Sequence, residues 1–236
     1  MAASGRIKRF YKSVTVEERE NRFAVLLDGR ALKTQGGEEL LAPTLSLAEA
    51  IADEWAGQDE HIVRSSMPMT GMQSAAIDGA GESGEWLDEV LNYLRSDLVC
   101  YRADTQDALA ERQAKVWDPY INFMREEFGA LLVTTTGIVA ITQPEAGLGA
   151  VRRALSKEAP ETLFALQIAT AICGSAVLAL NTWRHAVSAE AAFEASRVDE
   201  RFQEESWGVD DEAKDREARL RSDFLAVAQY LLLLES

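Results

Sequence analysis

The sequence predicts an α+β fold, in which a small N-terminal antiparallel β-sheet with a covering helix is followed by a larger, mainly α-helical part. Three observations lead to this prediction. Residues 7–34 alternate apolar and polar side chains, which is typical of half-buried strands. Pro68 and several glycines then punctuate residues 64–84. After this stretch, apolar residues recur at helical spacing to the end of the chain.

The predicted strands lie in the segments IKRFYKSVTV and RFAVLLDGRALKT, which carry β-branched and aromatic residues at alternate positions. Asp28-Gly29 separates two such runs. We expect a hairpin there, because glycine accepts the positive φ that a tight turn requires. Gly36-Gly37 marks a second turn. A sheet of so few strands needs a helix over its apolar face to be stable.

We expect that covering helix over residues 46–59. Ser46 and Glu49 form a capping-box pattern at its start. Leu47, Ile51 and Trp55 make an apolar stripe at helical spacing. The stripe favours a core position for Trp55, and a contact with a partner is the alternative.

We place the domain boundary at residue 70, with a β-rich domain over 1–70 and a mainly helical domain over 71–236. Segment 131–143 is rich in β-branched residues and is expected to be extended. Residues 163–180 are uncharged and long enough to raise the question of a membrane span. Small and polar residues dilute this segment and no basic cluster flanks it, so we expect a buried helix and no stable membrane insertion. The predicted helices of this domain are 84–95, 105–128, 145–157, 161–183, 188–206 and 210–234.

The charge balance excludes some classes of partner. The 236 residues carry 24 Lys and Arg against 39 Asp and Glu, which gives a net charge of −15. We expect no nucleic-acid partner, because phosphate contacts would work against this field. Residues 1–33 are different, with eight basic and four acidic side chains. A basic N-terminal segment on an otherwise acidic chain suggests a protein partner whose surface is basic or of mixed charge. The alternative is that the acidic residues only keep the protein soluble.

Few residues suit catalysis or metal binding. The chain has two cysteines and two histidines, all far apart in the sequence. Residues 79–84 satisfy G-x-G-x-x-G, but no buried strand precedes them, as a dinucleotide site requires. Carboxylates are so numerous that no pair marks an acid–base site. We expect no catalytic, cofactor or metal site. The alternative is a carboxylate-based enzyme of unknown substrate, with or without a metal.

The most distinctive segment is SRVDERFQEESWG, residues 196–208. It combines an apolar helical stripe with both signs of charge and ends in Trp-Gly. Arginine and tryptophan dominate the energetics of protein interfaces, so the segment predicts a protein-binding surface. The alternative is a surface helix with weak ion pairs and a core tryptophan at its C-terminal end.

Several strings occur together and in order. They are RFYKSVTV (9–16), LLDGRALKT (26–34), LAEAIADEWAGQ (47–58), MPMT (67–70), AAID (75–78), DLVCYRA (97–103), WDPYINF (117–123), TTGI (135–138) and SRVDERFQEESWG (196–208). Each string alone is unspecific. The ordered set, from about residue 7 to 230, resembles the family of F1-ATP synthase assembly chaperones that bind the free α subunit of F1. Gln35 departs from the proline expected after LKT, and Met69 and Met72 replace branched residues, which are conservative changes.

The resemblance implies a non-enzymatic chaperone that binds the unassembled α subunit, shields the apolar surface that the β subunit later covers, and hands α over during F1 assembly. It also implies a bacterial homologue acting in the cytoplasm, since the leader of the mitochondrial members is not recognised. We expect the following residues to contact the α subunit: Arg197, Glu200, Arg201, Glu204 and Trp207, with Trp55 and Asp118 as further candidates.

Overall fold

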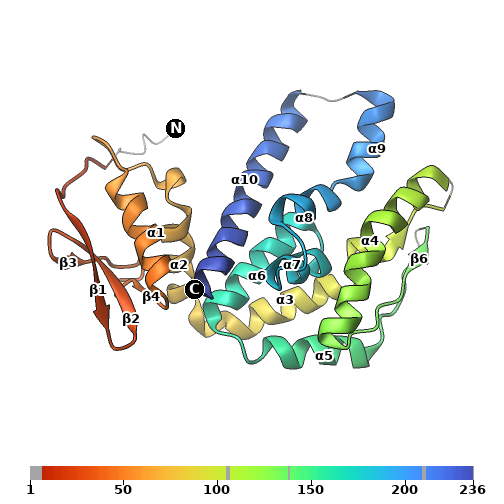
Figure 1. The fold of residues 1–236 in the computed structure, drawn as a ribbon, viewed down its shortest axis with the longest axis horizontal. Helices are drawn as coiled ribbons and strands as arrows, with labels where there is room; N and C mark the ends of the chain where they lie inside the picture. The colour runs from red at the N-terminus through yellow and green to blue at the C-terminus, as the bar shows by residue number, and fades with distance from the viewer. Residues whose placement is uncertain (1–6, 105–106, 138, 209–210, 236) are drawn as a thin grey trace. The chain divides into compact units, whose positions relative to one another are not determined.

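The computed structural model describes residues 7–104, 107–137, 139–208 and 211–235. Packing divides the chain into two compact units, one with the residues up to Glu82 and from Gln229 onward, the other spanning Ser83–Ala228. The α+β prediction is confirmed, because the first unit carries a small antiparallel sheet with a covering helix and the second is mainly helical (Figure 1). The expected boundary at residue 70 lies inside α2 (Pro68–Asp78), which belongs to the first unit.

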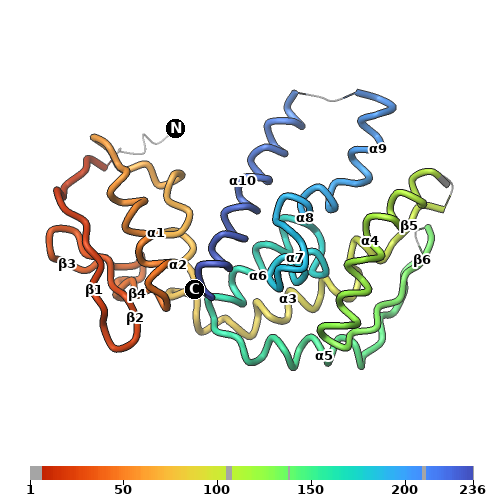
Figure 2. Tube along the Cα trace, viewed as in Figure 1, coloured from red at the N-terminus to blue at the C-terminus, as the bar shows by residue number. Residues whose placement is uncertain are grey.

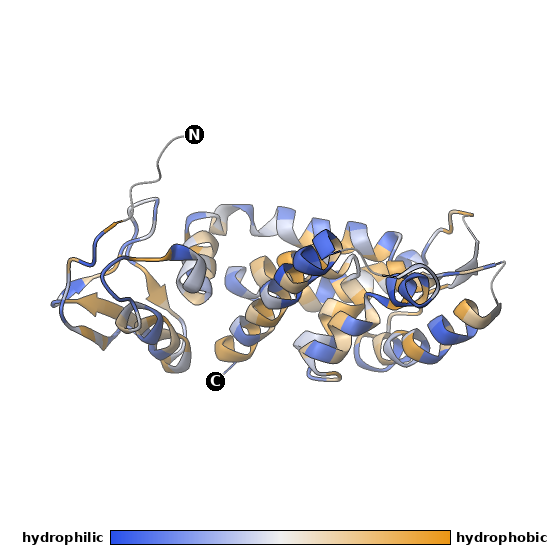
Figure 3. Cartoon of the chain, turned by 90° about the horizontal axis from the view of Figure 1, so that it is seen from above, coloured by the Kyte–Doolittle hydropathy of each residue, from blue (hydrophilic) through white to orange (hydrophobic). Residues whose placement is uncertain are grey.

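The sheet is built around its second strand. Its strands are β1 (Val14–Arg19), β2 (Arg22–Leu27), β3 (Arg30–Ala31) and β4 (Leu41–Ala42). β2 pairs antiparallel with each of the other three. The predicted turn at Asp28-Gly29 is confirmed, with φ of 49° and 79°, as a tight hairpin turn requires. β2 is mostly apolar (Figure 3), and its last four residues are buried.

Helix α1 (Leu45–Ala56) packs on β1 and β2. The expected capping box of Ser46 and Glu49 is wrong. Thr44 is the N-cap, because its extended backbone lets its hydroxyl accept a hydrogen bond from the Leu47 N–H at 3.2 Å. The stripe buries Leu47 and Ile51 completely but Trp55 only in part. Trp55 lies in the last turn of α1, where the edge of the Tyr11 ring packs against it with 5.6 Å between centroids.

The end of the chain completes this unit. Gln73 of α2 is fully buried; it donates to the Leu41 carbonyl at 2.7 Å and accepts a hydrogen bond from the Tyr230 hydroxyl. The Thr44 hydroxyl donates to the Leu233 carbonyl. The final residues of α10 (Asp211–Leu234) are thereby held beside α1 and α2. Two short 3-10 helices, Arg64–Ser66 and Ala80–Glu82, flank α2.

The helical unit contains a two-strand parallel pair as well as its helices. β5 (Tyr101–Arg102) follows a 3-10 turn at Leu98–Cys100 and pairs with β6 (Thr135–Thr136), beside α4 (Figure 2). The segment 131–143 is otherwise irregular where it is described. The helices before the predicted 161–183 segment are α3 (Ser83–Arg95), α4 (Asp107–Phe128) and α5 (Glu145–Leu155).

Two of the predicted helices are each divided in two. The 161–183 helix is α6 (Pro160–Cys173) and α7 (Ala176–Trp183), because Gly174 adopts a left-handed φ of 66° and Ser175 caps α7. The 188–206 helix is α8 (Ala189–Ala195) and α9 (Val198–Trp207). Both α6 and α7 are largely buried, as expected for 163–180. Within the described residues, no helix is long and apolar enough to cross a membrane.

A candidate partner-binding surface on the helical unit

Helix α9 carries four of the seven predicted contact residues, and a fifth, Arg197, is its N-cap. It starts after Arg197 and ends at Gly208, whose φ of 80° stops the helix. Only Val198 of this helix is buried, so most of its side chains face outward. The buried Trp117 indole donates to the Ala195 carbonyl at 2.7 Å and thereby fixes the chain just before α9.

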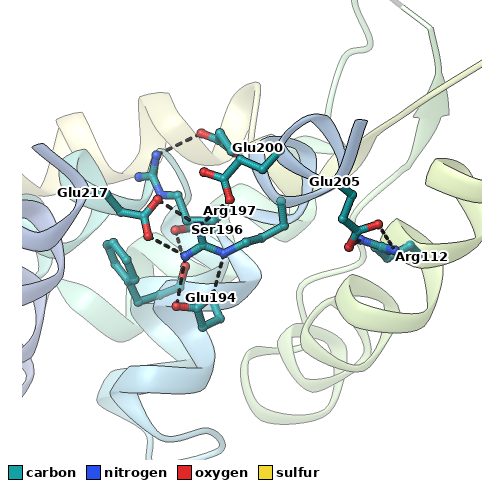
Figure 4. Close-up of polar contacts among 10 residues, drawn as sticks. Arg112, Glu194, Ser196, Arg197, Glu200, Glu205 and Glu217 are labelled. Atoms are coloured by element: carbon teal, nitrogen blue, oxygen red, sulfur yellow. Dashed lines mark hydrogen bonds and ion pairs between the residues drawn. The ribbon is translucent and has the colours of Figure 1, made fainter. Parts of the chain in front are cut away.

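Arg201 is the centre of an ion-pair cluster on this helix. Its guanidinium binds Glu194 of α8 at 3.1 Å, Glu204 of α9 at 3.0 Å and Glu217 of α10 (Figure 4). Hydrogen bonds to Glu217 and Glu194 raise the pKa of Arg201 further above its ordinary value. Arg201 therefore joins three helices and holds α9 beside α10.

Arg197 is more enclosed than Arg201. Its side chain is only 17% exposed, with one nitrogen bound to Glu200 at 3.0 Å and another to the Ile172 carbonyl at 3.0 Å. Its Nε–H is buried and has no hydrogen-bond partner among the described residues. A buried donor without an acceptor is costly, so a rearrangement of Arg197 that gave this N–H an acceptor would be favoured.

A groove runs beside these residues. It consists of two adjoining hollows of about 670 and 610 Å³, which share Arg197, Glu200, Arg216 and Leu220 in their walls. Arg216 and Arg219 of α10 line it, and neither forms an ion pair within the described part of the chain. Glu212 and Asp215 line it too and likewise have no ion pair among the described residues, so the groove offers charges of both signs that can pair with another protein.

The C-terminal end of α9 is anchored but carries an exposed aromatic ring. Arg112 of α4 binds Glu205 through two parallel hydrogen bonds of 2.7 and 2.9 Å. These bonds lower the pKa of Glu205. Trp207 is 89% exposed. The alternative in which this tryptophan is a core residue is wrong, because the helix ends with its last turn outside the packed interior.

Asp118 lies on α4 and acts through a chain of polar contacts. It binds Arg102 at 2.8 Å, and Arg102 also donates to the Gln113 carbonyl at 3.1 Å. The Gln113 side chain in turn donates to Asp199 of α9 at 2.7 Å. Asp118 therefore belongs to the support of α9. Trp55 lies in the other compact unit and is described below.

The sequence prediction missed the residues that other helices bring to α9. Glu217, Arg216 and Arg219 come from α10, and Glu194 comes from α8. Their charges are visible in the sequence, but nothing local shows that α10 lies beside α9. Among the described residues, no three His, Cys, Asp or Glu side chains are grouped in a way that could hold a metal ion.

Comparison with known proteins decides the family. The family model of the ATP12 chaperone protein matches residues 8–125. The crystal structure of Atp12 from Paracoccus denitrificans matches with a TM-score of 0.93 and 35% identity, over 97% of this chain and 98% of that one. The chain belongs to the ATP12 chaperone family.

Other relatives agree with this assignment. The mitochondrial protein atp12 of Schizosaccharomyces pombe is 25% identical over 221 residues, which is 88% of this chain and 76% of that protein. The Atu1473 protein of Agrobacterium tumefaciens matches with a TM-score of 0.91 and 36% identity, over 96% of this chain and 86% of that one. The predicted resemblance to F1-ATP synthase assembly chaperones is therefore confirmed. The groove between α9 and α10 is a candidate surface for the function of an ATP12-family chaperone.

Proposed function

We propose that this ATP12-family chain binds the unassembled α subunit of F1-ATP synthase, covers the apolar surface that the β subunit later occupies, and gives α up during F1 assembly. The chain would act in the cytoplasm and by binding alone, without a catalytic step. An unassembled subunit that exposes a large apolar patch is prone to aggregate, and a transient cover prevents this.

The observation that carries the proposal is the groove between α9 and α10. Arg216 and Arg219, together with the buried Nε–H of Arg197, offer donors that have no ion pair or acceptor among the residues that the structure describes. Trp207 adds a large exposed ring on the same helix. Such a combination of arginine, tryptophan and desolvated donors is typical of a protein interface. The fixed ion pairs of Arg201 hold the surface in one shape before the partner arrives.

Co-expression tests the proposal. The F1 α subunit is produced without β, with or without this chain, and soluble α is measured after centrifugation. We expect α to move from the pellet to the supernatant when the chain is present, and to co-purify with it without added nucleotide. Later addition of the β subunit should displace the chain from α.

A charge-reversal pair supplies the control. Arg216→Glu with Arg219→Glu should reduce the soluble α subunit, because both side chains line the groove. Lys157→Glu changes an exposed cation outside the groove and should leave capture unchanged. If α stays insoluble with the unaltered chain, or if the groove variant captures α as well as Lys157→Glu does, the proposed function or its site is wrong.

A further inference from the structure

The N-terminal unit has an open cavity of its own, with a volume of about 580 Å³. It is bounded by the chain at residues 7–10, the turn region 33–40, Trp55 of α1 and one side of α2. Most of its wall is apolar, and its size is that of pockets that bind ligands in other proteins. None of the α9 and α10 residues of the groove takes part in it.

A tryptophan that lines the cavity carries an unmet hydrogen-bond donor. Trp55 lines the cavity, and its indole N–H is buried without a partner among the described residues. The neighbouring backbone is already used, because the Tyr11 hydroxyl donates to the Trp55 carbonyl at 2.6 Å. An unsatisfied buried N–H destabilises the free protein, so a turn of the Trp55 ring that brings this N–H to an acceptor on a ligand would be favoured here.

The charged groups at the cavity are predominantly available cations. Lys33 and Arg64 line it, both are exposed, and neither forms an ion pair within the described ranges. Asp78 also lines it, but its carboxylate accepts hydrogen bonds from the Thr34 hydroxyl and, at 2.9 Å, from the Gly36 N–H. The cavity therefore presents two free positive charges and one carboxylate that is already bound.

The rim is apolar as well as charged. Phe10 is 68% exposed and Ile7 is 45% exposed, and both line the cavity. A small molecule inside the cavity would leave much of this surface in water. A polypeptide that places one side chain in the cavity and continues over the rim would cover it.

We propose that this cavity binds a segment of a partner protein in which an apolar side chain is flanked by Asp or Glu. The apolar side chain enters between Trp55, Leu40 and Met67, the flanking carboxylates pair with Lys33 and Arg64, and a carbonyl accepts from the Trp55 indole. This proposal rests on the proposed function and adds a second contact to it. Besides the groove, the cavity would bind the partner through a segment of defined chemistry. The cavity's binding of such a segment does not depend on which protein carries it.

The test uses the full chain with two peptides. The probe is acetyl-Glu-Phe-Glu-Leu-Glu-amide, and the control, acetyl-Lys-Phe-Lys-Leu-Lys-amide, keeps the apolar residues and reverses the charge. The indole N–H signals of the ¹⁵N-labelled protein are followed by NMR, with Trp55→Phe identifying the signal of Trp55. We expect the acidic peptide to shift that signal in a saturable way and the basic peptide to leave it in place.

Variants then locate the binding. The double variant Lys33→Gln, Arg64→Gln should bind the acidic peptide about tenfold or more weakly than the unaltered chain, since two charge pairs are lost. Lys12→Gln removes an exposed cation of the same unit outside the cavity and should bind as the unaltered chain does. No saturable shift, equal binding of both peptides, or equal binding by the two kinds of variant would overturn the proposal.

Glu200→Lys separates this proposal from the proposed function. It alters the groove on the helical unit, so we expect unchanged peptide binding by that variant. Peptide binding without capture of the α subunit would support the proposed cavity site and contradict the proposed function. Capture of the α subunit without peptide binding would support the proposed function and contradict the proposed cavity site.

Discussion

Arg201 of α9 and Glu217 of α10 form a close ion pair that joins the two helices bordering the groove. Both side chains are about two-thirds or more removed from solvent, at 32% and 26% exposure. The two residues lie on different helices and are 16 positions apart in the sequence, so their pairing is a tertiary contact. It fixes the spacing of the surface on which Arg197 and Arg216 lie.

Glu217→Gln should therefore loosen the groove more than it destabilises the protein. The remaining pairs of Arg201 with Glu194 and Glu204 limit the loss of stability to about 1 kcal/mol or less. Capture of the α subunit should fall, because the spacing of α9 and α10 is no longer fixed. Urea unfolding and the co-expression assay measure the two effects. Glu111→Gln, an exposed carboxylate of α4 outside the groove and without a described ion pair, is the matched control. Equal capture by both variants would contradict the role of the Arg201–Glu217 pair.

Two tryptophans of the helical unit should respond in opposite ways. Trp207 is 89% exposed, so Trp207→Ala should leave the free energy of unfolding within about 0.5 kcal/mol and should weaken capture. Trp117 is fully buried and donates to Ala195, so Trp117→Ala should cost about 3–5 kcal/mol. Thermal and urea unfolding measure both. Full capture by Trp207→Ala would remove that ring from the proposed interface.

Charge reversal at Glu200 tests the acidic side of the groove. Glu200 is half-exposed and its only described pair is with Arg197. Glu200→Lys places two cations side by side and turns Arg197 toward other acceptors. We expect weaker capture of the α subunit, with helicity and melting temperature unchanged by circular dichroism. A melting temperature that falls together with capture would mean that the effect comes from folding and not from binding.

Much of the fold was predictable because its signals are local. The Asp28-Gly29 turn depends on two residues that tolerate positive φ, and the helix predicted over 210–234 depends only on the helical spacing of its apolar residues. The break between α6 and α7 has a local signal, Gly174 followed by Ser175, which the prediction of one helix over 161–183 did not use. The support of that break could not be predicted, because Asp97, which accepts a hydrogen bond from the Ser175 hydroxyl at the start of α7, lies 78 residues earlier in the sequence.

The candidate surface, like the fold, was predictable only where its signal is local in the sequence. The alternation of charge on residues 197–204 predicts one face of α9, and the structure places those side chains on that helix. The other side of the groove comes from α10. Its charged residues do not stand out in the sequence of a chain with 39 acidic residues. The exposure of Trp207 could not be predicted either, since a tryptophan before glycine fits a buried helix end equally well. The interaction of Trp55 with Tyr11 likewise depends on a residue 44 positions before it, in the segment that precedes β1.

Asp97 is a fully buried carboxylate that holds the junction of α6 and α7. It accepts hydrogen bonds from the Ser175 hydroxyl at 2.6 Å and from the N–H groups of Val177 and Val99 at 3.0 and 3.2 Å. Burial disfavours the charged form and raises the pKa of Asp97 from 3.8 to about 6, although these hydrogen bonds act in the opposite direction. The folded protein therefore binds this proton more tightly than the unfolded chain does.

The pH dependence of stability follows from this difference. Above about pH 6, the charged carboxylate carries the full cost of burial. As the pH falls from about 6 toward about 4, Asp97 takes up its proton in the folded state before the unfolded state does, so its contribution to stability improves by about 3 kcal/mol. Many other carboxylates titrate in the same range, so the quantity to measure is the difference between the unaltered chain and Asp97→Asn. Urea unfolding at several pH values should show that the free energy of unfolding of the unaltered chain increases relative to that of the variant as the pH falls. A difference that does not change with pH, or that shrinks on acidification, would show that the hydrogen bonds at the α7 N-terminus outweigh burial and keep this carboxylate charged.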